Sequence, residues 1–172
     1  MNSSSNLLHK FAQTGASGND PGFWAIVAFD YYDGPERGIA IYPSGEGVRF
    51  SSFGDSKSRL FRAFELVPIS GDWRPEVKAL EQAASVESSS RVLVPAVSSD
   101  ILQRFEDAVF SAAATGLYVG VGSPNFGWMY VSAVTDEQID RLRQQRAPDA
   151  FQSVHSLIKA SPPAVGSIQY RR

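Results

Sequence analysis

The stretch that decides the fold is "FWAIVAFDYYDGPERGIAIYP", residues 23–43, where two apolar runs flank the sequence Asp33-Gly34-Pro35. The first run is apolar on both alternating faces as far as Asp30, as is typical of an interior strand. "DGP" favours a tight turn, because glycine tolerates positive φ and proline fixes φ near −65°. The second run, "GIAIYP", has the composition of another strand. The stretch therefore predicts a β-hairpin.

Two more strands are predicted directly after this hairpin. "SGEG" at 44–47 is a turn sequence and leads into the strand-like "VRFSSF" at 48–53. "RLFRAFELVPI" at 59–69 predicts a fourth strand, in which Pro68 either ends regular pairing or marks a sheet edge. The first seventy residues are thus expected to form an antiparallel meander.

The rest of the chain alternates between helical and strand patterns. Asp72 is a suitable cap for a helix in 74–86, and residues 101–115 carry apolar side chains at helical spacing. The remaining elements are predicted as a short strand at 91–97, a hairpin over 117–134, and helices at 137–146 and 149–160. This order predicts an α+β fold, with three to four helices packed mainly on one face of a largely antiparallel sheet.

Segment length and local residue composition indicate how the chain is divided into domains. Residues 1–22 are rich in Ser, Asn and Gly, so we expect a mobile N-terminal segment. Residues 23–172 have the length of an ordinary single domain, and a split into two subdomains near Ser88 is the alternative.

Composition argues against several classes of function. The chain has no cysteine, which removes disulfides, thiolate nucleophiles and the usual structural zinc sites and fits a reducing compartment. Its formal net charge is −2 and no Lys/Arg run exceeds two residues, so nucleic acid is not an expected partner. No signal peptide and no apolar run of about 20 residues is visible, so we expect a cytoplasmic protein with no membrane partner.

The weak catalytic candidates begin with a cluster in the opening hairpin. Asp30, Asp33 and Arg37 could supply acid, base and anion-binding groups, the minimum equipment of many hydrolases and isomerases. Asp33 also suits a tight turn, which is the structural alternative. Asp30 interrupts an apolar face, and a buried carboxylate there would need a partner such as Arg37, Arg49 or Arg62.

His155 is the other catalytic candidate, as the only histidine beyond His9 in the N-terminal segment. It lies beside an apolar helical stripe, where a half-covered structural histidine is the ordinary interpretation. With so few ligands no metal site is expected. "GVGSPNFG" at 120–127 lacks the dinucleotide-binding spacing, so no cofactor is expected either.

The aromatic residues favour a binding function. Tyr31 and Tyr32 lie in the opening hairpin, Trp73 comes just before a predicted helix and Trp128 just after the turn "SPNF", positions typical of recognition surfaces. For the two tryptophans, closure of the core is the structural alternative. We therefore expect a non-enzymatic cytoplasmic protein that binds a protein, either another chain or itself, with an inhibitor or immunity-type role as one form. The alternatives are a carboxylate hydrolase or isomerase, and a protein with a small-ligand pocket lined by aromatic residues.

Overall fold

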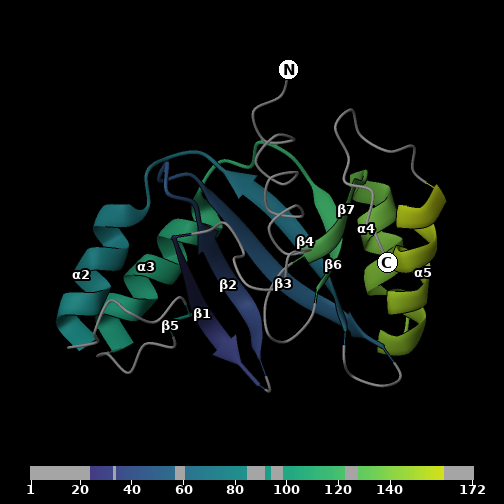
Figure 1. Cartoon of the computed structure of the whole chain (residues 1–172), viewed down its shortest axis with the longest axis horizontal. Helices are drawn as coiled ribbons and strands as arrows, with labels where there is room; N and C mark the ends of the chain where they lie inside the picture. The colour runs from purple at the N-terminus through teal and green to yellow at the C-terminus, as the bar shows by residue number, and fades with distance from the viewer. Residues whose placement is uncertain are drawn as a thin grey trace. The chain divides into compact units, whose positions relative to one another are not determined.

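The computed structural model describes residues 24–32, 34–56, 61–84, 92–93, 99–122 and 128–160, and it confirms the α+β class (Figure 1). The predicted N-terminal segment, residues 1–22, lies outside the described residues. The described elements are β1 (Ala25–Tyr31), β2 (Pro35–Ile41), β3 (Gly47–Asp55), β4 (Arg62–Ile69), α2 (Arg74–Ala84), β5 (Val92–Leu93), α3 (Ser99–Ser111), β6 (Tyr118–Gly122), β7 (Trp128–Ala133), α4 (Asp136–Arg143) and α5 (Ala147–Ala160).

The strands form one sheet in the order β5-β1-β2-β3-β4-β6-β7. Pairing is antiparallel between β1 and β2, β2 and β3, β4 and β6, and β6 and β7, whereas β5 pairs with β1 in parallel. The meander and the later hairpin are therefore confirmed. That the helices pack mainly on one face stays a prediction.

The chain divides into two compact units, and strands β3 and β4 each contribute residues to both of them. The hairpin unit comprises the described residues within 23–51 and 67–116, and the C-terminal unit those within 52–66 and 117–172. The alternative of a split near Ser88 falls outside the described residues. A single domain over 23–172 stays a prediction.

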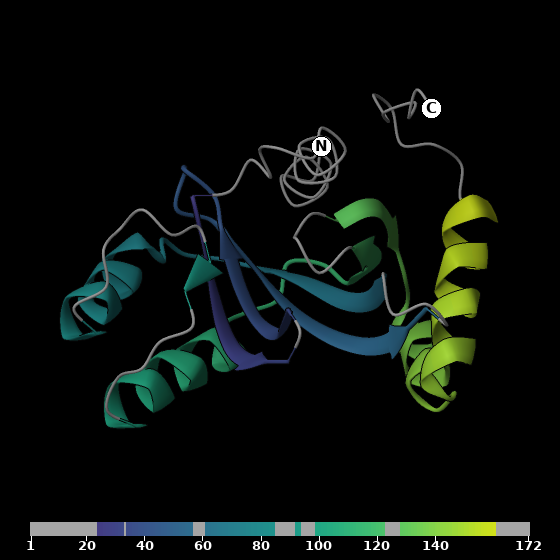
Figure 2. The same ribbon diagram turned by 60° about the horizontal axis from the view of Figure 1, so that its bottom comes forward.

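In the hairpin unit, apolar side chains of β1 and β2 are buried together with those of two helices. The helices α2 and α3 lie side by side (Figure 2). Val77 and Leu80 of α2 and Phe105 and Val109 of α3 are all buried, at the helical spacing of three and four residues. Phe29 of β1 contacts the Phe105 ring at 5.6 Å between centroids, which places α3 against β1.

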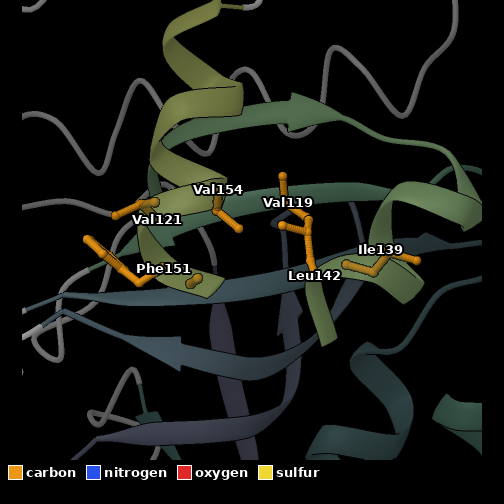
Figure 3. Close-up of a cluster of buried hydrophobic side chains, with 7 residues drawn as sticks. Val119, Val121, Ile139, Leu142, Phe151 and Val154 are labelled. Carbon is orange, nitrogen blue, oxygen red and sulfur yellow. The ribbon is translucent and has the colours of Figure 1, made fainter. Parts of the chain in front are cut away.

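The C-terminal unit has its own apolar cluster, drawn in Figure 3. Val119 and Val121, two residues apart on β6, share one face of the strand. Helices α4 and α5 cover that face, α5 lying against both β6 and β7. The cluster consists of Ala63, Val119, Val121, Ile139, Leu142, Phe151 and Val154.

Capping side chains and a proline lie at several boundaries of the helices and strands. Thr135 caps α4 through a capping box, in which its hydroxyl accepts from the Gln138 N–H and its own N–H donates to the Gln138 side chain. Asp72 accepts the Arg74 N–H at the start of α2, as predicted. Pairing of β4 with β6 ends at Leu66, before Pro68. Within the described residues, no helix is long and apolar enough to cross a membrane.

Candidate interaction site at the end of the first hairpin

The turn end of the first hairpin is irregular. Asp30 of β1 lies opposite Arg37 of β2, and Tyr31 lies opposite Pro35, with a register shift on each side of Asp30. The Tyr32 N–H donates to the Gly34 carbonyl at 3.0 Å, and Gly34 has a φ of 123°, a conformation that favours glycine. Asp33 lies outside the described residues. Such bulges redirect the side chains next to them.

The irregular register explains how Asp30 fits at the end of an apolar strand. In a regular strand, consecutive side chains point to opposite faces. Phe29 nevertheless packs on the rings of Phe105 and Phe110 in α3, while Asp30 reaches Arg37, whose guanidinium also lies over Phe110. The register shift after Ala28 breaks the alternation that would separate these two neighbours. Asp30 is 59% exposed, so the expectation of a buried carboxylate is wrong.

Arg37 connects the hairpin to α3 and is the predicted partner of Asp30. Its Nη1 donates to Asp30 Oδ2 at 3.1 Å, and its Nη2 donates to Glu106 Oε1 of α3. The guanidinium carbon lies 4.1 Å from the centroid of the Phe110 ring, which is cation–π distance. Two carboxylates and one aromatic face thus hold this half-buried side chain in place.

A second arginine holds the end of the same helix. Arg49 of β3 donates its Nη1 to the carbonyl oxygens of Val109 and Phe110, both at 3.1 Å, and of Ala112 at 3.4 Å. A cation at a helix C-terminus satisfies carbonyl groups that have no partner within the helix and interacts favourably with the helix dipole. Arg62, the other partner considered for Asp30, pairs with Asp55 at 3.4 Å.

Tyr31 and Tyr32 are exposed beside this anchored network. Tyr31 is 53% exposed and Tyr32 is 71% exposed, and no other large hydrophobic side chain in the described part of the chain is classed as exposed. Neighbouring aromatic rings that remain exposed to water are typical of contact surfaces. Both residues are predicted binding residues, and the structure places them together.

The two tryptophans differ from this pattern. Trp73 is only 8% exposed, so the expected surface position is wrong. Its backbone N–H donates to the Gly45 carbonyl at 2.9 Å, and its ring centroid lies 6.2 Å from that of Phe105, which places it in the core of the hairpin unit. Trp128 begins β7 opposite Gly122, and its side chain lies outside the described residues.

His155 lies elsewhere, on α5 of the C-terminal unit. Its ring stacks on Phe151 with 6.2 Å between centroids and 10° between planes, and the residue is half-buried. This contact gives the imidazole a packing role in its own helix. In the described ranges, no group of three or more His, Asp or Glu side chains could hold a metal ion.

Sequence reasoning missed two members of the site, Glu106 and Phe110. They are four residues apart on α3 and therefore neighbours on one helix face, next to the apolar stripe that includes Phe105 and Val109. Nothing in the helical spacing of these two residues indicates that both contact Arg37.

Comparison with known proteins adds no relative from which a function could be transferred. No protein-family model matches the chain, and neither a curated protein nor a solved structure matches it. Inference about function therefore depends on the geometry of the described residues.

Proposed function

We propose that this protein acts in the cytoplasm by binding another protein through the turn end of its first hairpin, and that it is not an enzyme. The observation that carries the proposal is the exposure of Tyr31 and Tyr32, two consecutive residues where β1 ends. A tyrosine ring offers a large contact area at a low cost in side-chain entropy, which is why tyrosines are enriched at binding hot spots.

The contacts of Arg37 next to the tyrosines support this role. Arg37 joins β1, β2 and α3 through Asp30, Glu106 and Phe110, so the strand end that precedes the tyrosines is held before any partner arrives. A contact surface that is already ordered loses less entropy on binding. An inhibitor or immunity-type protein is one form of this function, because such a protein needs shape and charge complementarity rather than catalytic groups.

The contacts of Arg37 make the carboxylate-enzyme alternative less favourable. To hold an anionic substrate, Arg37 would have to exchange its bond to Asp30 or Glu106 for the new one. Asp30 as a base would likewise lose the cation that pairs with it. The alternative requires Asp30→Asn to abolish turnover of a substrate without unfolding the protein. The small-ligand pocket stays a prediction.

Affinity capture with matched variants tests the proposal. Tagged protein, the double variant Tyr31→Ala/Tyr32→Ala, and a control double variant Gln152→Ala/Lys159→Ala on the exposed face of α5 are incubated with lysate of the native host. We expect the unaltered chain and the control to retain the same protein at a stoichiometric level, and the tyrosine variant to lose it. Equal retention by all three would contradict the proposal.

Light scattering on the purified chain identifies the case in which the partner is a second copy. A dimer that dissociates in Tyr31→Ala/Tyr32→Ala would assign the surface to self-association. A monomer that retains its captured protein would assign it to a different chain.

A further inference from the structure

We infer that the surface contacting the hairpin end is cationic: a protein surface that presents arginine or lysine side chains to Tyr31 and Tyr32. The inference rests on the proposed function and specifies the chemistry of the partner. It follows from two properties of the same few residues, their charge and their exposed aromatic rings.

The charged side chains at this end of the hairpin sum to an acidic excess. Among the described residues of the segment 29–37, Asp30 and Glu36 are acidic and Arg37 is basic, so they sum to −1. Glu106 of α3 adds −1 through its bond to Arg37, and Arg49, whose guanidinium carbon lies 5.7 Å from the centroid of the Phe110 ring, adds +1. The total over these five residues is therefore −1.

The positive charges of this group are directed inward. Arg37 donates to Asp30 and Glu106 and covers Phe110, and Arg49 donates to the carbonyls at the end of α3. The Asp30 carboxylate, in contrast, remains 59% exposed while it is paired. An approaching surface thus meets carboxylates and tyrosine rings, and charge complementarity favours a basic partner.

The exposed rings add a second attraction for the same kind of group. The face of a tyrosine ring carries negative electrostatic potential and attracts ammonium and guanidinium groups. Within this unit, Arg37 already packs on Phe110 at 4.1 Å in that way. Tyr31 and Tyr32 can offer the same contact to an arginine or lysine of a partner, with a carboxylate next to them.

The test uses N-acetylated hexa-arginine amide as the probe, with hexa-glutamate as its control, and follows the backbone amides of the full chain by NMR. We expect hexa-arginine to shift the amides of Asp30, Tyr31, Tyr32 and Glu36, more weakly as salt is added. Hexa-glutamate should leave them unshifted. Equal shifts at Asp136 and Glu137 of α4, or no shifts at the hairpin, would overturn the inference.

Two pairs of variants refine this test. Tyr31→Leu/Tyr32→Leu keeps apolar area but removes the ring faces, and should weaken hexa-arginine binding about tenfold. Glu36→Gln should weaken it about two- to fivefold, whereas Glu137→Gln on α4 removes the same charge and should have no effect. Unchanged binding in the leucine variant would overturn the cation–π part of the inference.

The leucine variant also separates the inference from the proposed function. If the captured protein is lost by Tyr31→Ala/Tyr32→Ala and kept at full affinity by Tyr31→Leu/Tyr32→Leu, the hairpin end binds a partner through apolar contact. That result retains the proposed function and rejects the cationic partner. Retention by both variants rejects both.

Discussion

Arg37 is the residue that gives the hairpin end its structure. It contacts two carboxylates and an aromatic face at once, which a guanidinium can do because its N–H donors lie in the plane of the group while its flat face remains available for stacking. A lysine ammonium has no such flat face. The contacts of Arg37 therefore depend on the shape of the side chain as well as on its charge.

Replacing Arg37 should destabilise the protein. Arg37→Ala leaves the half-buried Glu106 without this cation and removes the contact over Phe110, so we expect the free energy of unfolding in urea to fall by about 1–3 kcal/mol. Arg37→Lys should lower the free energy of unfolding by less than Arg37→Ala does, because the positive charge remains. Arg104→Ala, an exposed arginine on the same helix, is the control and should change stability by less than about 0.5 kcal/mol. An equal loss in both alanine variants would contradict the assignment.

Tyr42 should make stability depend on alkaline pH. Burial raises the pKa of the Tyr42 phenol well above its ordinary value, and the nearby Glu46 carboxylate raises it further. The unfolded chain therefore releases this proton first: the stabilisation is fully present below about pH 10 and is lost as the pH rises through the folded-state pKa.

Substitution of Tyr42 by phenylalanine isolates this effect. The free energy of unfolding, measured from about pH 8 upward, should decline less steeply above about pH 10 in Tyr42→Phe than in the unaltered chain. Tyr32→Phe removes an exposed phenol and should keep the original slope. Identical slopes for all three proteins would show that Tyr42 does not contribute.

The sequence predicts the short-range part of the site and not its long-range part. Asp30 and Arg37 are seven residues apart around a recognisable turn, so hairpin register alone makes them neighbours. Glu106 is 69 residues from Arg37 in the chain, and nothing local to either residue specifies the other. The exposure of Asp30 also escaped prediction, because it follows from a register shift that the sequence pattern does not encode.

At the scale of elements, Gly54 sets how closely α5 approaches β3 in the C-terminal unit. A Cβ at this position would lie 2.9 Å from the Ala147 carbonyl oxygen and 3.0 Å from the Phe151 nitrogen, both backbone atoms of α5. A backbone segment cannot move aside as the end of a flexible side chain can. The glycine is thus required by contact between elements.

Gly54→Ala should therefore displace α5 and lower stability. We expect the free energy of unfolding to fall by about 1–3 kcal/mol, as for overpacking elsewhere. Ser52→Ala, two residues earlier on β3, is the matched control and should cost less than about 1 kcal/mol. Amide hydrogen exchange along α5 should accelerate in Gly54→Ala only, and unchanged exchange there would contradict the packing argument.

Element boundaries were less predictable than the elements themselves. The strand expected at 91–97 has two described strand residues, Val92 and Leu93, and its other residues lie outside the described part. The last helix begins at Ala147 rather than 149, because Pro148 fits a first helical turn, where its missing N–H has no intrahelical partner to lose. The predicted start at residue 149 is therefore two residues late.

For the whole molecule, the sequence predicts that strands adjacent in the chain pair with each other. It does not predict the crossover by which β6 returns to pair with β4. Strands β1 to β4 follow one another in the sheet, as short turns favour. β6 pairs with β4 only after the chain has passed through α2, β5 and α3, and no spacing rule identifies the strand to which it returns. The candidate site divides in the same way: the exposed tyrosines are residues that the sequence pattern indicates, whereas the contacts of Arg37 with Glu106 and Phe110 arise from the tertiary fold.

Site-specific photo-crosslinking tests the central claim most directly. A photoreactive phenylalanine replaces Tyr32 in one protein and the exposed Gln152 of α5 in a control, and both are irradiated in lysate of the native host. We expect one discrete crosslinked protein from position 32, with its attachment site in an arginine- or lysine-rich segment, and none from position 152. The absence of a discrete product at position 32, or the same product from both positions, would contradict the claim that the hairpin end is the binding surface.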